Sequence, residues 1–456
     1  MRSLFSAGLA VALASPFAAA ADTASDIQAL RQEMEAIRAN YEQRLQVLEQ
    51  RLKAAEAAAL APAASVAAAP TAVAPAPGTR GGANAFNPEI SLIMSGLYTR
   101  TSRDPANYSL SGFHLPLDAE VGPGTRGLSL SESELGFSAN IDPYLRGSAA
   151  IAIAPDNTVS VEEAFVQTTS LGNGLTLKAG RFFSGIGYLN EKHAHTWDFV
   201  DAPLAYQAFL GNQFGDDGLQ LRWLAPTDLF LEAGAEVGRG RPFPGGDNSR
   251  NGAGATAVYG HIGGDFGASS SWRAGLSMLN AKANDQGLVF SSAPDSAITS
   301  SFTGRTRVAV ADFVYKWAPN GNATRTNFKL QGEYLRSRRD GSLVADLEGA
   351  ATAGDYRATK SGWYLQGVYQ FMPRWRVGLR TERLDAGTTR FDANPVLFDS
   401  AGYRPHKDTL MLDFNPSEFS RVRLQLARDY SRNGLPDNQL FLQYQMSLGA
   451  HGAHGF

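Results

Sequence analysis

The sequence has no cysteine among its 456 residues. A disulfide framework, which stabilises many small exported domains, is therefore excluded. Stability must come from a large buried surface or from a surrounding membrane, and a chain of this length can supply an extensive core.

Long apolar runs are missing as well after the first 21 residues. A transmembrane helix needs about 20 consecutive apolar residues, so none is predicted in the mature chain. A strong excess of one charge is also absent, because 41 Lys and Arg residues stand against 44 Asp and Glu residues, with a net charge of -3. This balance gives no reason to expect a nucleic-acid partner.

The short signatures of several enzyme classes do not occur. There is no Gly-x-Ser-x-Gly turn and no His-Glu-x-x-His helix. The glycine-rich segment GRGRPFPGG lacks the lysine and the following helix of a phosphate-binding loop. The sequence therefore predicts a protein that is not an enzyme, and it indicates no cofactor.

The N-terminal segment 1–21 has the organisation of a cleaved secretory signal. Arg2 precedes a short apolar run, and small residues follow up to Ala21. Ser15 and Pro16 interrupt the run, which is too short for a membrane-spanning helix. A buried N-terminal helix is the alternative, but the pattern favours export from the cytoplasm.

Residues 22–56 show helical periodicity without Gly or Pro, and residues 57–86 are rich in Ala and Pro. About four heptads with one stutter predict a coiled coil, and a single amphipathic helix lying on a partner is the alternative. The Ala/Pro-rich segment predicts a semi-extended linker. The apolar positions of the heptads are Ile27, Leu30, Met34, Ile37, Tyr41, Leu45, Leu48 and Leu52.

From residue 87 to 456 apolar and polar residues alternate in about sixteen segments of roughly 9 to 15 residues. Short turns alternate with longer connections rich in Gly, Asp and Ser. This pattern predicts an antiparallel transmembrane β-barrel of about 16 strands. A soluble β-sandwich would also alternate, but about 370 residues would need two sandwiches, and no internal linker separates them. The longer connections are expected at residues 102–126, 238–252, 282–304 and 385–406.

Several charged residues fall on the predicted inward faces of the strands. An arginine that faces lipid costs a few kcal/mol near the midplane, which favours the inward assignment. Acidic and basic rows on different parts of the wall would produce a transverse field that orients dipolar solutes. Positions at the barrel rims are the alternative for some of the arginines. The predicted pore-lining residues are Glu132, Glu134, Arg374, Arg376, Arg380, Arg421 and Arg423.

Four segments of the chain resemble a family of proteobacterial outer-membrane proteins of porin-like build, whose members are often labelled zinc-regulated TonB-dependent outer-membrane receptors. The similarity covers most of the chain from residue 87. A TonB-dependent receptor needs a plug domain and a barrel of about 22 strands. This sequence has a helix and a linker in place of a plug, so it resembles trimeric porins instead. The four segments are ELGFSANIDPYLRGSAAIAI, VEEAFVQT, LKAGRFFSGIGYLNEKHAHTWDFVDAPL and LGAHGAHGF.

The resemblance implies a homotrimer in the outer membrane of a Gram-negative bacterium, in contact with its lipid. The coil and both termini would lie in the periplasm, where the coil could contact periplasmic proteins or the cell wall. In trimeric porins the third outward loop folds inward, and here that loop spans about residues 184–214. Its predicted constriction residues are Tyr188, Glu191, Lys192, His193, His195, Asp198 and Asp201.

His193 and His195 also suggest a metal site, because paired histidines with nearby carboxylates can hold a divalent ion. Solvated or hydrogen-bonded loop histidines are the alternative. Two functions are therefore predicted. One is a passive, water-filled channel for small hydrophilic solutes or ions. The other is a substrate-specific uptake protein that binds a metal ion or metal complex.

Overall fold

The computed structural model describes residues 88–117, 120–246, 251–291, 297–347 and 349–449. The predicted signal (1–21), coiled coil (22–56) and linker (57–86) lie outside the described residues. No helix in the described part of the chain is long and apolar enough to cross a membrane.

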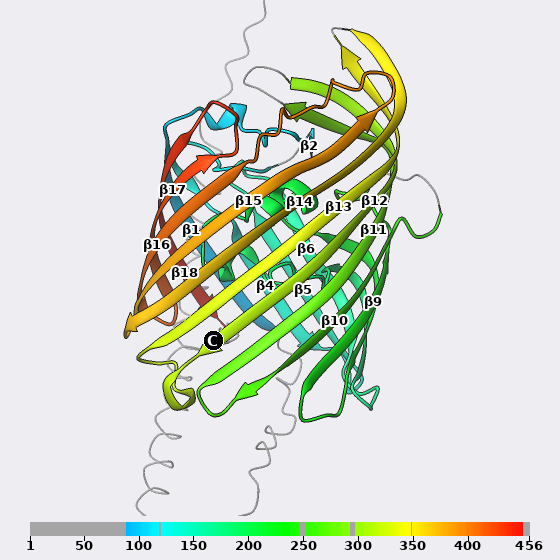
Figure 1. The fold of residues 1–456 in the computed structure, drawn as a ribbon. Helices are drawn as coiled ribbons and strands as arrows, with labels where there is room; N and C mark the ends of the chain where they lie inside the picture. The colour runs from blue at the N-terminus through cyan, green and yellow to red at the C-terminus, as the bar shows by residue number, and fades with distance from the viewer. Residues whose placement is uncertain (1–87, 118–119, 247–250, 292–296, 348, 450–456) are drawn as a thin grey trace, which may run out of the picture. The chain divides into compact units, whose positions relative to one another are not determined.

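The described chain forms one antiparallel sheet that closes on itself (Figure 1). β3 (Gly127–Leu130) and β4 (Ser133–Asn140) both pair with β1 (Glu89–Thr101) and act as one interrupted strand. β2 (Phe113–Pro116) lies in a connecting loop, so the wall has 16 strands. The others are β5 (Leu145–Ile153), β6 (Val159–Thr168), β7 (Leu175–Phe183), β8 (Gly215–Leu224), β9 (Phe230–Gly238), β10 (Ala255–Phe266), β11 (Ser270–Ser291), β12 (Ala297–Trp317), β13 (Asn327–Leu347), β14 (Ala350–Met372), β15 (Trp375–Phe391), β16 (His406–Ser417), β17 (Ser420–Tyr430) and β18 (Asp437–Gly449).

The first and last strands close the barrel. Leu92 of β1 lies opposite Leu135 of β4 on one side and Leu448 of β18 on the other. Consecutive strands pair around the remaining circumference, so the sheet that the described residues form is closed. The predicted antiparallel barrel of 16 strands is confirmed.

Alternation along each strand separates an apolar outer face from a polar inner face. On β18, Leu442 and Tyr444 are exposed on the outside, whereas Gln443 and Gln445 are buried on the inside. The side-chain period of two in a strand produces this division directly. The sequence pattern therefore determines which face of the wall meets the lumen.

The wall is uneven in height. The strands from β4 to β9 have 8 to 10 residues each and form what we call the short wall. The strands from β11 to β14 have 21 to 23 residues and β15 has 17, and we call these strands, together with the shorter neighbouring strands β16 and β17, the tall wall. Figure 1 shows the long hairpins rising above the rest of the barrel.

The prediction of a loop at 282–304 is wrong, because β11 continues to Ser291 and β12 already begins at Ala297. The predicted loop at 385–406 likewise begins as strand, because β15 extends to Phe391. In the first of these segments Leu288, Phe290 and Phe302 point inward and are fully buried. Their burial stabilises strand pairing in a segment whose Gly, Ser and Asp content suggested a loop.

Two connections enter the barrel. The β1–β3 connection contains η1 (Pro105–Asn107) and β2, which pairs with β11 from Leu288 to Ser291. β2 thus covers part of the edge of β11 beyond Ala281, the residue at which the pairing between β10 and β11 ends. The β7–β8 connection contains η2 (Ala194–Thr196) and α2 (Leu204–Leu210), a short helix whose residues are all buried.

A hydrophobic cluster fills the lumen beside the tall wall. α2 packs there against β2 and against inward side chains of β13 to β15. Phe209 of α2 contacts Phe113 of β2 edge to face, with ring centroids 5.8 Å apart. Gly211 ends the helix in the left-handed conformation, with φ of 62°. The β7–β8 connection is therefore packed against the wall as a folded element.

Candidate functional site

We call residues 184–214 the inward loop, and its base is closed by one asparagine. The backbone N–H of Ser184 donates to the carbonyl oxygen of Phe214 at 3.0 Å. The Asn190 side-chain amide donates to the carbonyl oxygens of both residues at 2.8 Å, and its oxygen accepts from the Phe214 N–H at 2.8 Å. Asn190 is fully buried, so the two ends of the loop are held together inside the barrel.

The loop lies between walls of different charge. The inner face of the short wall is rich in glutamate, although Lys178 and Arg222 also lie there. The inner face of the tall wall is rich in cations, although Asp312, Glu333, Glu382, Asp413 and Asp429 interrupt it. The glutamates are Glu134, Glu162, Glu163, Glu232 and Glu236, and the cations include Arg273, Lys316, Lys329, Arg376, Arg380, Lys407, Arg421 and Arg423.

His193 binds the loop to the short wall. Its Nδ1 lies 2.8 Å from Glu134 Oε2 and 3.2 Å from Glu162 Oε2, and its Nε2 lies 3.0 Å from Glu163 Oε2. Burial alone would lower the pKa of His193, but the three carboxylates outweigh burial and raise it well above its ordinary value. His193 is therefore a cation at neutral pH. Next to it, His195 Nδ1 lies 3.3 Å from Glu134 Oε2.

Asp198 binds the loop to the tall wall. Its carboxylate forms ion pairs with Lys329 and with Arg376 Nη1, the latter at 3.3 Å. It also accepts a hydrogen bond from the Gln366 amide at 3.2 Å. Burial would raise the pKa of Asp198, but Lys329 and Arg376 outweigh burial and lower it.

Asp201 makes a second contact with the tall wall, and its basic partners there are more deeply buried than those of Asp198. Arg380 Nη2 donates to its Oδ1 at 2.8 Å, and Lys407 Nζ donates to its Oδ2 at 2.6 Å. The Gln425 amide donates to Oδ1 at 2.8 Å. Burial would raise the pKa of Asp201, but Lys407 and Arg380 lower it, so the carboxylate stays charged. The loop thus presents its cation to the acidic wall and its carboxylates to the basic wall.

Tyr188, Glu191 and Lys192 belong to a segment of the loop that is less buried than its two aspartates. Glu191 Oε2 lies 3.0 Å from Arg222 Nη2, and Arg273 lies over the Tyr188 ring at 5.3 Å. Burial raises the pKa of Tyr188 to about 12, so its hydroxyl remains protonated. Lys192 is exposed.

The structure places some of the predicted site residues as expected and others differently. Asp198 and Asp201 lie in the loop as expected, but they are buried in ion pairs and do not line an open passage. Arg374 does not lie on the wall, because it occupies the turn between β14 and β15, is exposed and has φ of 72°. Glu132 lies in the gap between β3 and β4. The expected inward residues that lie on wall strands are Glu134, Arg376, Arg380, Arg421 and Arg423.

Glu333 and Glu382 hold the loop in place and were not singled out from the sequence. Glu333 accepts hydrogen bonds from the Tyr206 hydroxyl at 2.8 Å and from the Leu189 N–H at 2.9 Å. Glu382 accepts from the Leu204 N–H at 2.5 Å. Alternation places both carboxylates inward, but it does not distinguish a group that binds loop backbone from one that meets solvent.

Among the described residues, one group of histidines and a carboxylate has the spacing of a metal site. Ligand atoms of Glu134, His193 and His195 lie within 4.8 Å of one another, and the two imidazole rings are stacked at 5.6 Å. Glu134 Oε2 is buried between the two histidines, 2.8 Å from His193 Nδ1 and 3.3 Å from His195 Nδ1. Nitrogen and carboxylate oxygen ligands suit zinc. Binding would require His193 to lose its proton.

Sequence comparison gives one distant relative and no family. No family model matches the chain. A protein of Aquifex aeolicus (strain VF5), described as uncharacterized, is 29% identical over 398 residues, which span 82% of this chain and 80% of that protein. The candidate site must therefore be interpreted from its own geometry.

Solved barrels of several bacteria are similar to the chain at low sequence identity. A loop-deletion mutant of OmpT, an outer membrane protein of Vibrio cholerae, is 10% identical over 80% of this chain and all of that one, with a TM-score of 0.49. The outer membrane channel DcaP of Acinetobacter baumannii is 10% identical over 80% of this chain and 97% of that one, with a TM-score of 0.46. An anion-selective porin from Comamonas acidovorans is 12% identical over 79% of this chain and 99% of that one, with a TM-score of 0.46. Because these scores are below 0.5, the fold is defined here by the strand pairing of this chain.

Proposed function

We propose that this protein is a channel of the Gram-negative outer membrane for small hydrophilic solutes or ions, with the inward loop as its constriction. The observation that carries the proposal is the closed 16-stranded wall, apolar outside and charged inside. A closed barrel pairs every backbone polar group of its wall, which lipid requires. No reaction is assigned to it.

The outer face supports the membrane location. Leu276 and Leu379 are 72% and 64% exposed on that face, with many other large apolar side chains around them. Apolar area of this extent is stable only against lipid or another protein. Because Ser91 lies opposite Gly449, both ends of the described chain lie at the short-turn end of the barrel, which we place in the periplasm.

The passage is expected to run beside the inward loop. Lys329 and Arg376 are about one fifth exposed on the tall-wall side, and Glu162 and Glu163 are partly exposed on the short-wall side. Opposite charges on facing sides of a narrow passage produce a transverse field. Such a field orients dipolar solutes as they pass.

The proposed assembly is a homotrimer. The heptad pattern of residues 22–56 favours self-association, and the number three comes from the resemblance to trimeric porins. In the periplasm the coil could also contact other proteins or the cell wall. Mass measurement of the intact protein in mild detergent should give a trimer. Monomer alone, with residues 22–56 present, would contradict this assembly.

Recordings in a planar bilayer test the channel. Purified protein should produce stable, ohmic current steps without any added energy source. A protein that inserts, keeps the heat resistance of a folded barrel and conducts no current would exclude an open channel.

A second function is favoured by the group formed by Glu134, His193 and His195. If the protein takes up a metal ion, micromolar zinc should block or gate the wild-type channel. The His193→Ala, His195→Ala double variant should lose this response. His261→Ala is the matched control, because His261 also faces the lumen and pairs with a glutamate, Glu232, at 2.9 Å. Equal zinc responses in all three proteins would exclude this second function.

A further inference from the structure

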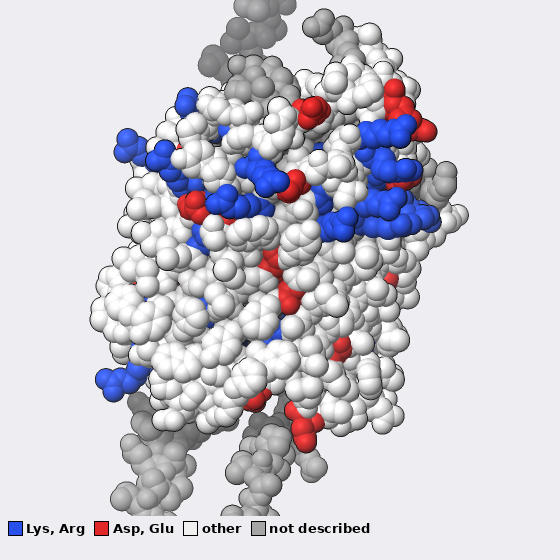
Figure 2. Space-filling model, viewed as in Figure 1, with Lys and Arg blue, Asp and Glu red and all other residues white. Residues whose placement is uncertain are grey.

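The outer surface of the tall wall carries basic side chains that the channel does not use. We call Lys282 of β11, Arg305 and Arg307 of β12, and Arg336 and Arg338 of β13 the outer basic patch. All five residues are exposed, and they alternate along their strands with buried inward residues. Figure 2 shows Lys and Arg side chains gathered in the upper part of this face, above a surface with few charges.

Strand register brings like charges together in the patch. Arg307 lies directly opposite Arg338, and Arg305 lies opposite Lys282 on one side and Asp340 on the other, where Asp340 forms its ion pair with Arg357. Like charges at directly opposed positions of a sheet are destabilising. Within the described residues, no carboxylate forms an ion pair with Arg305, Arg307, Arg336 or Arg338. An anion from outside the chain would therefore stabilise this surface.

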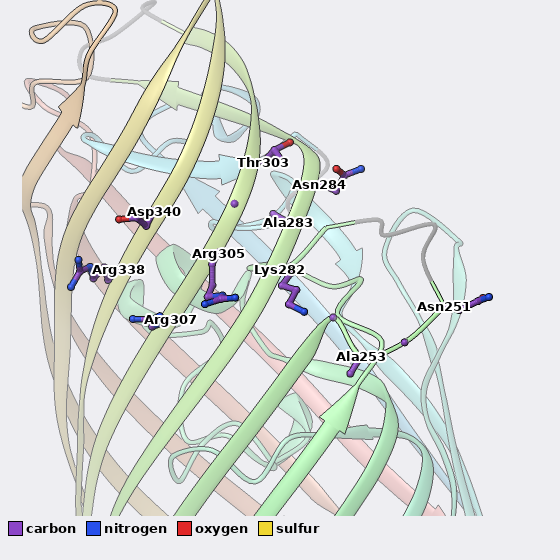
Figure 3. Close-up of a pocket in the computed structure, with 13 residues that line it drawn as sticks. Asn251, Ala253, Lys282, Ala283, Asn284, Thr303, Arg305, Arg307, Arg338 and Asp340 are labelled. Atoms are coloured by element: carbon purple, nitrogen blue, oxygen red, sulfur yellow. The ribbon is translucent and has the colours of Figure 1, made fainter.

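The patch borders a hollow of suitable size. Lys282, Arg305, Arg307 and Arg338 line a depression of about 800 Å³ on the outer side of β11 to β13, together with Asp340, whose carboxylate pairs with Arg357 (Figure 3). Residues 251–254 form its opposite rim. The depression exists because β10 starts pairing at Ala281 of β11, whereas β11 and β12 continue well beyond that point.

Apolar side chains follow directly along the same strands. Met278, Phe313 and Tyr334 face outward and are exposed nearer to the short-turn end. The patch thus lies at the boundary between the apolar outer face and water, on the side of the long hairpins. In the proposed orientation this is the headgroup level of the outer leaflet.

We propose that the outer basic patch binds the phosphate groups of an anionic glycolipid in the outer leaflet. Guanidinium groups bind phosphate through paired hydrogen bonds, and adjacent arginines match a headgroup with more than one phosphate. The headgroup occupies the depression, and its acyl chains extend along Met278, Phe313 and Tyr334. The inference rests on the proposed membrane location, but it is independent of conduction and of zinc.

Native mass spectrometry of the full-length protein in detergent tests the inference, with diphosphorylated lipid A as the probe. The test variant is Arg307→Gln, Arg338→Gln. Each basic side chain at a membrane surface contributes about a fivefold gain in binding, so the double variant should bind the lipid about 30-fold more weakly. The control variant is Arg390→Gln, Arg404→Gln, which removes the same charge from arginines already paired with Asp392 and Asp385. It should bind as the wild type does.

Two further probes identify the source of the phosphate. Dephosphorylated lipid A should bind weakly to the wild type and to both variants, and inorganic phosphate should not displace the bound lipid at millimolar concentration. Equal lipid binding by wild type and test variant would overturn the proposal. Equal binding of the dephosphorylated lipid, or displacement by inorganic phosphate, would overturn it as well.

Stability and conduction complete the test. In neutral detergent the test variant should melt at a higher temperature than wild type, because the opposed pair of cations is relieved. With phosphorylated lipid present the order should reverse, and an unchanged order would count against the proposal. Bilayer conductance should be the same in both proteins. A wild type that binds the lipid but never conducts would contradict the channel function alone.

Discussion

The short and tall walls hold the same loop by different means. On the short wall the loop is held by His193, whose side chain is 20% exposed among glutamates. On the tall wall it is held by Asp201, whose side chain is 6% exposed, and by the hydrophobic packing of α2. Charge pairs contribute more where water is excluded and less where solvent screens them. The tall wall is therefore expected to be the stronger attachment.

The largest effect is expected when the tall-wall attachment is removed. Asp201→Asn removes the carboxylate that Arg380 and Lys407 share, while Arg380 keeps Glu382 at 2.9 Å and Lys407 keeps Asp429 at 3.7 Å. Breaking a buried pair costs about 3–5 kcal/mol when the remaining charge is left unpaired, so we expect a loss of about 3 kcal/mol here. Thermal melting in detergent should show the lower stability, and bilayer recordings should show a loop that no longer holds one position.

An exposed ion pair supplies the control. Asp392→Asn breaks the ion pair with Arg390. The Asp392 side chain is 47% exposed and the Arg390 side chain is 77% exposed, so the substitution should cost less than about 1 kcal/mol of stability. Equal melting temperatures for Asp201→Asn and Asp392→Asn would show that the buried contact does not stabilise the loop.

An intermediate effect is expected from pH, with opposite sign at the two walls. The pKa of Asp201 is lowered, so its contribution is complete above pH about 3.9 and declines as pH falls through the lowered pKa. The pKa of His193 is raised, so its contribution is complete below pH about 6.5 and is lost as pH rises through the raised pKa. The loop should be held most firmly between these limits.

Trp197 can report both transitions, because it lies in the loop, is buried and donates to the Lys192 carbonyl oxygen at 2.8 Å. Its fluorescence, taken as the difference between wild type and Trp197→Phe in chelator-treated buffer, should change at acid and at alkaline pH. His193→Gln should abolish the alkaline change only. An alkaline change that persists in this variant would contradict the role of His193.

The smallest effects are expected from charges that face the remaining lumen. Glu162→Gln removes a partly exposed carboxylate from the short wall, and Lys192→Gln removes an exposed cation from the loop. The first should shift the reversal potential towards anion preference and the second towards cation preference, both modestly because water and salt screen these groups. Shifts of the same sign would mean that the two residues do not line one passage.

Much of the barrel could be predicted from alternation, because a period of two in the sequence becomes two faces of a strand. The same rule failed at Arg374, which shares the parity of Arg376 but lies in the turn before Trp375, where β15 begins. Odd- and even-numbered residues face opposite sides only within a strand. Where a strand ends depends on its pairing with the neighbouring strands, which alternation alone does not reveal. The extra height of β11 and β12 was missed for the same reason, since it depends on inward packing of Phe290 and Phe302.

The sequence by itself determined the class of fold, the number of wall strands and the polar character of the segment 184–214. Those properties follow from local periodicity and composition. The tertiary structure alone decided that Asp198 and Asp201 are buried anchors, that Glu333 and Glu382 support the loop, and that Arg307 lies opposite Arg338. Those contacts join residues far apart in the chain, because closing the barrel determines strand register and brings the inward loop against the opposite wall.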